Sequence, residues 1–396
     1  MERRRLRVAM VAGEPSGDHL AAGLIEALRA RRPATTFVGV GGPKMAAAGC
    51  EILFDMERIG VIGLDGLLGK LPGIVAIRRR LLARFTAAPP DLFVGVDAPD
   101  FNLGLEGKLK RTGVTCVHYV SPTVWAWRGY RIRKIRRCIN HMLTLFPFEA
   151  DYYRRHRVPV TCVGHPMADQ ISEPNRAAAR RRLNLGDGLL IALLPGSRRS
   201  EIARLGGVLI DAARRILEQH PGAEFVLPFA NQAAAECFNT IAGRHDHGAS
   251  GGLPVHTLDA PSDPPARDWR TPARLALEAC DVAILASGTA ALEAALLRRP
   301  HIVVYKLAAV SYWLMRRLRH VDHYSMPNQL LPAPMVPELI QDRATAANIA
   351  EQTGRLLGDA RRTADLERHF ADLHRALRRG ADARAADTVL QLAGAR

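Results

Sequence analysis

Closely spaced cysteines are missing from this 396-residue sequence. Its six cysteines form no CxxC pair and lie far apart, at Cys50, Cys116, Cys138, Cys162, Cys237 and Cys280. That spacing argues against a zinc site or a disulfide framework and fits a reducing compartment. Long apolar runs are also missing, and the short run at residues 8–13 is broken by GEPSGD. We therefore expect no spanning helix and no signal peptide, but a soluble or peripheral protein.

Acidic residues are scarce relative to basic ones. Lys plus Arg number 55 and Asp plus Glu number 39, so the net charge is +16, and the pI is about 10.3. Such a balance predicts an anionic partner, which can be a nucleic acid, an acidic membrane surface or a phosphorylated substrate. Charge alone does not choose among these three. The 48% hydrophobic content is ordinary for a globular protein of two or three domains.

Short apolar runs alternate with helical stretches along most of the chain, which predicts parallel sheets covered by helices on both faces. The first half has strand candidates at 6–11, 36–40, 91–96, 114–119, 141–145 and 160–163. The second half has candidates at 189–194, 224–228, 255–258, 281–285 and 301–304. We predict an α/β fold with two Rossmann-like domains, residues 1–175 and 176–365, facing across a cleft. Residues 366–396 are expected to form C-terminal helices that pack back on the first domain.

Two motifs of the first half follow predicted strands, where open α/β sheets bind ligands. Gly13–Asp18 contains Ser16 and Gly17, and a ligand loop is as good an interpretation as a turn in which Ser16 or Asp18 caps the next helix. The stretch GVDAPDFN holds Asp97, Asp100 and Asn102. Helix capping explains Asp100 better than Asp97, so Asp97 is the preferred general base.

The second half repeats this pattern of strand, small-residue turn and helix. LPGSRRSE places Gly196, Ser197 and Arg198 at such a turn, where backbone N–H groups and a guanidinium suit a diphosphate. ASGTAALE places the turn Ser287–Thr289, with Gly288 between them, at a second such position, and Glu293 one helical turn later could reach a ribose diol. Ser197 as a plain helix cap and Glu293 as a surface residue are the alternatives.

Two basic stretches carry further hypotheses. Residues 125–137 interleave basic and aromatic side chains, which can clamp nucleic acid but also fits a solvated basic helix beside a cleft wall. Residues 67–85 combine apolar and basic positions at helical spacing. This segment is either a basic amphipathic helix on an anionic membrane or a helix packed on the sheet.

Taken together, the motifs resemble the lipid-A-disaccharide synthase family of GT-B type glycosyltransferases. The resembling strings, in family order, are VAGEPSGD, GVGGPKMAAAGCE, VGVDAPDFN, HYVSPTVWAWR, FPFE, VGHPMAD, LLPGSRRSEI, LASGTAALE and the looser YSMPNQLL. They span about residues 8–331. Each string alone is weak, whereas the ordered set is highly specific.

The resemblance implies an inverting transfer from UDP-2,3-diacylglucosamine to 2,3-diacylglucosamine 1-phosphate (lipid X), giving the β-1,6-linked disaccharide 1-phosphate and UDP. It implies no cofactor or metal, a homodimer, an acceptor- and membrane-side first domain, a UDP-sugar-binding second domain, and a cytoplasmic, peripheral place on the anionic inner face of the inner membrane. Asp97 and Arg198 match the family's catalytic positions. The expected substrate and UDP contacts are Ser16, Gly17, Asp100, Asn102, Trp127, Gly196, Ser197, Ser287, Gly288, Thr289, Glu293 and Asn328.

Two rival functions remain. A UDP-sugar epimerase or hydrolase of the same two-lobed build would share the nucleotide site, but would leave VDAPDFN beside HYVSPTVWAW unexplained. A basic nucleic-acid-binding protein centred on residues 125–137 would leave both turn motifs without a purpose. We therefore expect no nucleic-acid partner.

Overall fold

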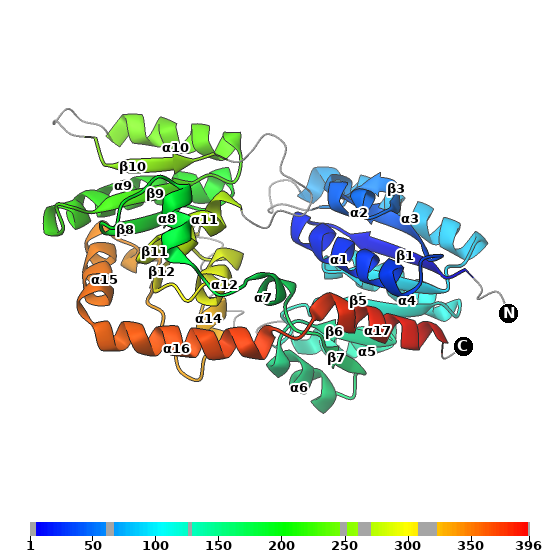
Figure 1. The fold of residues 1–396 in the computed structure, drawn as a ribbon. Helices are drawn as coiled ribbons and strands as arrows, with labels where there is room; N and C mark the ends of the chain where they lie inside the picture. The colour runs from blue at the N-terminus through cyan, green and yellow to red at the C-terminus, as the bar shows by residue number, and fades with distance from the viewer. Residues whose placement is uncertain are drawn as a thin grey trace. The chain divides into compact units, whose positions relative to one another are not determined.

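The computed structural model describes residues 5–60, 67–125, 129–245, 252–259, 271–307 and 323–394. The chain forms two compact units, coloured by residue number in Figure 1. Unit 1 comprises Met1–Asp169 with Leu377–Arg396, and unit 2 comprises Gln170–Ala376. The sequence prediction placed the domain limits at 175/176 and 365/366. In the structure the chain enters unit 2 a few residues earlier than predicted, and it leaves unit 2 later than predicted, near the end of the helix Ala360–Leu377.

Unit 1 is built on a parallel sheet with the strand order β3-β2-β1-β4-β5-β6-β7. The central strands are almost completely buried, as a sheet covered on both faces requires. The strands are β1 Arg7–Ala12, β2 Thr36–Gly41, β3 Cys50–Asp55, β4 Leu92–Val96, β5 Thr115–Tyr119, β6 His141–Thr144 and β7 Val160–Cys162. Every strand predicted for this half is present, whereas the edge strand β3 was missed because it is only partly buried and lacks a continuous apolar run.

Two helical layers cover this sheet. The first contains α1 Pro15–Arg31, α2 Pro43–Ala47 and the C-terminal α17 Ala381–Gly394, which packs against α1 (Figure 1). In the second, α3 Leu67–Ala87 packs on α4 Pro99–Arg111, and α4 packs on α5 Ile132–Cys138. The connecting elements are η1 Met56–Arg58, η2 Gly129–Arg131, α6 Pro147–Arg155 and α7 Pro166–Gln170.

Unit 2 repeats the architecture with the parallel order β10-β9-β8-β11-β12-β13. Its strands are β8 Leu190–Leu194, β9 Glu224–Pro228, β10 Val255–Leu258, β11 Val282–Ala286, β12 His301–Tyr305 and the unpredicted edge strand β13 Glu338–Ile340. Its helices are α8 Arg176–Arg182, α9 Arg199–Gln219, α10 Gln232–His245, α11 Pro272–Ala279, α12 Thr289–Leu296, α14 Met326–Leu330, α15 Ala346–Gly358 and α16 Ala360–Leu377, with η3 Gln341–Arg343. The prediction of two parallel-sheet α/β halves is thus confirmed.

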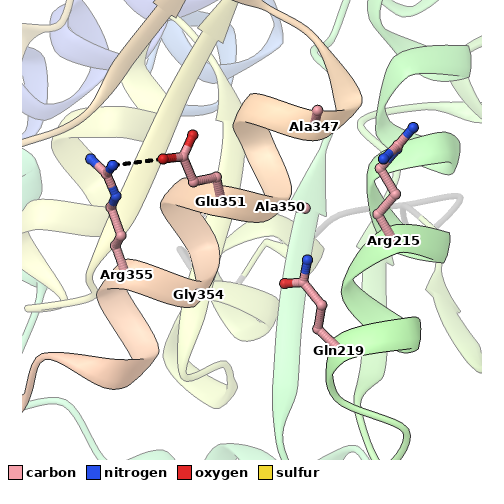
Figure 2. A pocket seen from close by; sticks show the side chains of 7 residues that line it. All are labelled: Arg215, Gln219, Ala347, Ala350, Glu351, Gly354 and Arg355. Atoms are coloured by element: carbon pink, nitrogen blue, oxygen red, sulfur yellow. Dashed lines mark hydrogen bonds and ion pairs between the residues drawn. The ribbon is translucent and has the colours of Figure 1, made fainter.

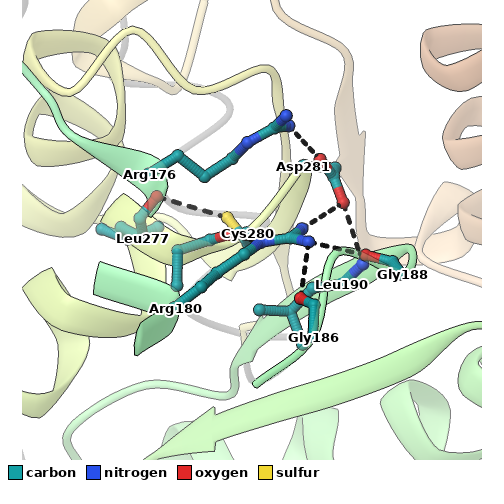
Figure 3. Close-up of polar contacts among 9 residues, drawn as sticks. Arg176, Arg180, Gly186, Gly188, Leu190, Leu277, Cys280 and Asp281 are labelled. Atoms are coloured by element: carbon teal, nitrogen blue, oxygen red, sulfur yellow. Dashed lines mark hydrogen bonds and ion pairs between the residues drawn. The ribbon is translucent and has the colours of Figure 1, made fainter. Parts of the chain in front are cut away.

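A buried arginine joins α8 to the beginnings of β8 and β11 (Figure 3). The Arg180 guanidinium donates to the carbonyls of Ala279, Gly186 and Gly188 at 2.8–3.0 Å and to the Asp281 carboxylate at 2.8 Å. The same Asp281 oxygen accepts from the Leu190 amide at 2.9 Å, so one carboxylate links two neighbouring strands. Arg176, which is half exposed, pairs with the other oxygen of Asp281.

The described helices include none that is both long and apolar enough to cross a membrane. The predicted helix over residues 67–85 is confirmed as α3, and it packs on the sheet through Ile74, Ile77, Leu81 and Phe85. The alternative in which residues 67–85 pack on the sheet is therefore correct for one side of this helix. Its other side remains exposed at Leu71, Arg79 and Arg80.

Candidate active site

In each unit the predicted motifs follow the two strands at which the sheet order reverses. In unit 1 these are β1 and β4, and in unit 2 they are β8 and β11. Connections that leave two adjacent parallel strands in opposite directions open a crevice at their carboxyl ends, which is where open α/β sheets bind ligands. The structure therefore brings Ser16, Gly17, Asp97, Asp100 and Asn102 to one edge of unit 1. It brings Gly196–Arg198 and Ser287–Thr289 to one edge of unit 2.

Glycines allow the β1 and β4 loops of unit 1 to touch. A Cβ added to Gly13 would lie 2.9 Å from the Ala98 Cβ, and one added to Gly17 would lie 3.4 Å from the Val96 carbonyl oxygen. Helix α1 begins at Pro15, so the exposed Ser16 lies inside the first turn and is not its cap. The buried Asp18 caps a different helix, α2, by accepting from the amides of Gly42, Lys44 and Met45 at 2.7–3.1 Å.

Asp97 is held by its backbone while its carboxylate is left without a hydrogen bond from any described residue. Its amide donates to the Tyr119 carbonyl at 2.8 Å, and its carbonyl accepts from Asn102 Nδ2 at 2.8 Å. Asp97 and Ala98 have φ values of 52° and 41°, in the left-handed region that non-glycine residues rarely occupy. Such strain persists where surrounding contacts enforce it, and it is concentrated at functional sites. A half-buried carboxylate is thereby presented at the crevice.

Asn102 is fully buried beneath this loop. Besides the Asp97 carbonyl, its Nδ2 lies 3.2 Å from the Val11 carbonyl oxygen and 3.4 Å from that of Val96. Its amide nitrogen thus ties the ends of β1 and β4 to the strained turn. In this arrangement Asn102 positions Asp97 from below and does not face the crevice.

Asp100 lies in the first turn of α4 and is exposed. It is not the cap of α4, because that position is Ala98, and its carboxylate instead pairs with Arg131 of η2 at 2.7 Å. The two carboxylates three residues apart therefore have different surroundings: Asp100 is neutralised by Arg131, whereas no described arginine pairs with Asp97. This difference favours Asp97 as a base on geometry as well as on the family resemblance.

The segment after β5 adds a buried polar network to the same edge. Trp125 Nε1 donates to Glu149 Oε1 at 3.4 Å, the Phe146 amide donates to Glu149 Oε2 at 3.2 Å, and Ser121 Oγ lies 3.0 Å from Tyr153 Oη. Burial raises the pKa of Glu149 to about 7, although hydrogen bonds from Phe146 and Trp125 oppose the shift. The network fixes the Trp125 indole, while the expected contact Trp127 lies outside the described residues.

In unit 2 a carboxylate already occupies the turn expected to hold a diphosphate. Glu201 Oε2 accepts from the amides of Ser197 and Arg198 at 3.2 and 3.4 Å, and Glu201 Oε1 lies 3.5 Å from an Arg198 guanidinium nitrogen. Gly196 has φ 114°, and an added Cβ would lie 2.5 Å from Glu201 Oε2. Glu201 is thus the capping-box residue of α9, and it contacts the exposed Arg198; its carboxylate is held by the same amides that are expected to bind the diphosphate.

The second turn of unit 2 is open. Gly288 and Thr289 are exposed, and apart from its neighbours along the chain no described residue has a heavy atom within 4 Å of a Cβ added to Gly288. The Ser287 amide donates to the Val304 carbonyl at 3.2 Å, and its hydroxyl lies 3.4 Å from the Tyr324 carbonyl oxygen. Burial raises the pKa of Glu293 to about 7, and the neighbouring Arg274 opposes that shift.

Asn328 organises the segment that follows Tyr324. Its Nδ2 donates to the Val336 carbonyl and to Glu338 Oε1, both at 2.8 Å, and its Oδ1 accepts from the amides of Met335 and Val336. Both donors and both acceptor positions of this amide are therefore used within the protein. A direct contact of Asn328 with a nucleotide would require one of these bonds to break.

Sequence reasoning did not single out four polar groups at these edges. Glu149, Glu201 and Glu338 organise loops through backbone amides. The first two are capping-box residues three positions after the helix cap, whereas Glu338 holds amides 13 and 14 residues away. The fourth is Lys44, at the carboxyl end of β2, whose Nζ lies 3.0 Å from His19 Nδ1. Burial, Lys44 and His165 together lower the pKa of His19 to about 3, so this imidazole is neutral at neutral pH.

A separate groove of about 480 Å³ lies in unit 2, far along α9 from its N-terminal turn (Figure 2). Arg215 and Gln219 of α9 line it together with residues of α15, of which Glu351 and Arg355 form an ion pair at 2.6 Å. About sixteen helical residues, or roughly 24 Å, separate Arg215 from the start of α9. None of the predicted site residues lines this groove, so it is not the candidate active site.

Two parallel-sheet α/β units, each with ligand loops at its switch point, define the GT-B class of nucleotide-sugar enzymes. Solved structures agree: the chain matches the UDP-GlcNAc 2-epimerase from Neisseria meningitidis bound to UDP-GlcNAc with a TM-score of 0.63 at 11% identity, covering 99% of this chain and 100% of that one. CalG4, the calicheamicin glycosyltransferase, matches with a TM-score of 0.60 at 16% identity, covering 99% of each chain. At such identities the likeness establishes the fold alone.

The sequence comparisons identify the family within that class. The lipid-A-disaccharide synthetase family model matches residues 8–389. The lipid-A-disaccharide synthases of Pseudomonas aeruginosa (strain UCBPP-PA14) and Pseudomonas fluorescens (strain Pf0-1) are 47% and 46% identical, each over 98% of this chain and 98% of the relative. The chain belongs to the lipid-A-disaccharide synthase family, and it is a glycosyltransferase of lipid A biosynthesis.

Proposed function

We propose that the enzyme transfers the diacylglucosaminyl group of UDP-2,3-diacylglucosamine to the 6-hydroxyl of 2,3-diacylglucosamine 1-phosphate, with Asp97 as general base and Arg198 as a principal ligand of the leaving UDP. The family membership supports the reaction. The observation that carries the assignment of the base is the Asp97 carboxylate itself, which is presented by a strained turn and left unpaired by the described residues.

Unit 1 supplies the base in this proposal. A sugar hydroxyl has too high a pKa to be deprotonated in advance, so Asp97 accepts its proton as the bond to the anomeric carbon forms. Positioned general bases typically contribute about 10²–10⁴-fold. Tethering of the Asp97 amide and carbonyl to Tyr119 and Asn102 supports this role, because rigid placement is what makes such a base effective.

Unit 2 supplies the anion site. Negative charge grows on the diphosphate as the anomeric carbon becomes oxocarbenium-like. The Arg198 guanidinium and the amides of Gly196–Ser197 are suited to stabilise that charge, with the open turn Ser287–Thr289 beside them. The Glu201 carboxylate accepts hydrogen bonds from the Ser197 and Arg198 amides. When the diphosphate binds, this carboxylate moves away from the two amides or shares them with the diphosphate. Glu293 remains the proposed contact to the ribose diol.

The membrane and the assembly belong to the same proposal. Both substrates are acylated and phosphorylated, so we place the enzyme on the cytoplasmic, inner face of the inner membrane, where anionic lipids attract basic proteins. A surface Lys or Arg near such a leaflet contributes about 1 kcal/mol. The net charge of +16 supports this placement. Homodimer formation stays a prediction, which sedimentation velocity measures.

The test compares Asp97→Asn with Asp100→Asn, two isosteric changes three residues apart. Purified proteins receive both acylated substrates in mild detergent with EDTA, and mass spectrometry follows UDP and the disaccharide. We expect Asp97→Asn to lower kcat by at least about 100-fold. Asp100→Asn, which removes only an exposed pair with Arg131, should lower it by less than about tenfold.

Equal losses in the two variants, or full activity of folded Asp97→Asn, would remove Asp97 as the base. Activity of the wild type in EDTA supports the expectation that no metal is needed. Release of UDP from the acylated donor without acceptor would favour the epimerase or hydrolase alternative, whereas release that depends on the acceptor supports transfer. No disaccharide from folded wild type, with metal restored, would contradict the proposed reaction.

A further inference from the structure

Unit 1 has a basic groove on its second helical layer, which contains α3, α4 and α5. It has a volume of about 560 Å³ and lies between α4 and the η2–α5 segment. At its base α4 and α5 are in close contact, since a Cβ added to Gly107 would lie 2.8 Å from the Cys138 sulfur. The Tyr130 ring stands at its rim and is 74% exposed. The basic residues of the groove are Arg111, Arg133, Lys134 and Arg137.

These four cations have no carboxylate partner among the residues that the structure describes. The acidic side chains of α4 are committed elsewhere: Asp100 pairs with Arg131, and Glu106 is completely buried against His118 at 2.7 Å. The η2–α5 segment has no acidic residue at all. Four like charges around one groove repel one another, so an anion bound there would relieve that repulsion.

The groove is separate from the candidate active site. Helix α4 starts at Pro99, beside Asp97, and ends at Arg111. Twelve helical steps of 1.5 Å place Arg111 about 18 Å from the start of α4, and eight steps place Gly107 about 12 Å from it. Among the described residues that line the groove, none is proposed for catalysis or UDP binding.

The neighbouring helix α3 is also basic and belongs to the same helical layer. Helix α3 packs on α4 and has no acidic residue, while Arg79, Arg80 and Arg84 are exposed. Leu71 of α3, 40% exposed, and Tyr130 are the large hydrophobic side chains most open to solvent in the described part of the chain. Cations with a few projecting apolar groups are the pattern of a surface that rests on anionic lipid.

We propose that the groove between α4 and α5 binds the phosphate-bearing head group of an anionic phospholipid. Guanidinium groups match phosphate oxygens in geometry, and a tyrosine ring suits the boundary between head groups and acyl chains. The volume is that of a small-molecule site. A nucleic acid would need several stacking rings along an extended track, and Tyr130 is a single ring. The inference rests on the membrane placement proposed above and locates its contact, but it does not depend on the catalytic roles.

The test uses two triple variants of the full-length enzyme. Arg133→Ser/Lys134→Ser/Arg137→Ser removes three cations from the groove. Arg181→Ser/Arg182→Ser/Arg361→Ser removes the same charge from exposed positions of unit 2. Flotation is measured with vesicles of phosphatidylcholine, with and without phosphatidylglycerol. At about fivefold per cation, the groove variant should bind phosphatidylglycerol vesicles about 100-fold more weakly than the wild type, while the matched control stays within a few-fold.

Three further measurements decide the nature of the ligand. Activity on detergent-dispersed substrates should be the same in both variants and the wild type, which separates this inference from the catalytic proposal. Millimolar inorganic phosphate should leave vesicle binding in place; complete displacement by it would indicate a free-phosphate site. Equal loss of vesicle binding in both variants, or none in either, would overturn the groove as a site. A groove variant that loses single-stranded RNA binding but keeps vesicle binding would assign the surface to nucleic acid.

Discussion

Asp97 and Ala98 are two consecutive residues in left-handed backbone, and this conformation is held by contacts from three strands. Tyr119 of β5 accepts from the Asp97 amide, while Asn102 connects the Asp97 carbonyl to the ends of β1 and β4. Strain of this kind costs on the order of 1–3 kcal/mol per residue. The buried Asn102 amide offsets part of that cost, which makes it a positioning residue for the proposed base.

Glu149 offers a pH-dependent test of the network behind Trp125. Burial raises the pKa of its carboxyl from 4.5 to about 7. Between these two values the unfolded chain has lost the proton that the folded protein retains, so the free energy of unfolding falls as pH rises through this range. Above about pH 7 the loss is complete, at about 3 kcal/mol or less.

We expect Glu149→Gln to remove this part of the pH dependence. Thermal unfolding is measured from pH 5 to pH 8 for both proteins, and the difference in stability is followed. The variant should be the less stable protein at pH 5, because it loses hydrogen-bond geometry, and should gain on the wild type as pH rises. Glu293 and Asp382, whose pKa values are also raised by burial, titrate in both proteins and cancel in the difference. A difference that is flat with pH would contradict the shift.

At the scale of elements, the short helix α8 depends on one side chain for its place on the unit 2 sheet. Arg180 is 5% exposed, and its guanidinium donates to three backbone carbonyls and to Asp281. Asp281 in turn holds the Leu190 amide at the start of β8. The strands that carry the Gly196 and Ser287 turns are thereby aligned at their opposite, amino ends.

Removing this arginine should destabilise unit 2 far more than removing its exposed neighbour. Arg180→Ala leaves buried carbonyls without donors and should cost about 3 kcal/mol, a fall in Tm on the order of 10 °C. Arg176→Ala, whose side chain is 51% exposed, loses an outer ion pair with the same Asp281 and should cost less than about 1 kcal/mol. Thermal unfolding followed by circular dichroism measures both. Equal falls in Tm for the two variants would mean that the buried hydrogen bonds of Arg180 stabilise unit 2 no more than the exposed ion pair of Arg176.

At the scale of the whole molecule, the charge of +16 should make membrane attachment sensitive to salt. The Debye length falls from about 10 Å at 0.1 M salt to about 3 Å at 1 M, which screens exposed cations such as Arg133 and Arg79. We expect flotation of the wild type with phosphatidylglycerol vesicles to decline steeply over this range. Attachment unaffected by 1 M KCl would instead point to apolar insertion, for which Leu71 is exposed.

Much of the fold was predictable because it rests on local patterns. Buried parallel strands such as β4 and β8 are continuous apolar runs, and the helices between them begin at small-residue turns. The edge strands β3 and β13 were missed for a physical reason. Each is short or half exposed, so neither needs the continuous apolar run on which strand recognition depends.

The sequence by itself determined the fold class, the family and the residue types at the ends of β1, β4, β8 and β11, because strand burial and ordered motifs are local properties. Only the tertiary structure decided which partners those residues have. Asp18 caps α2, whereas Asp100 pairs with Arg131. Such pairings depend on which strands become neighbours, and spacing along the chain carries no record of an approach between residues far apart in sequence.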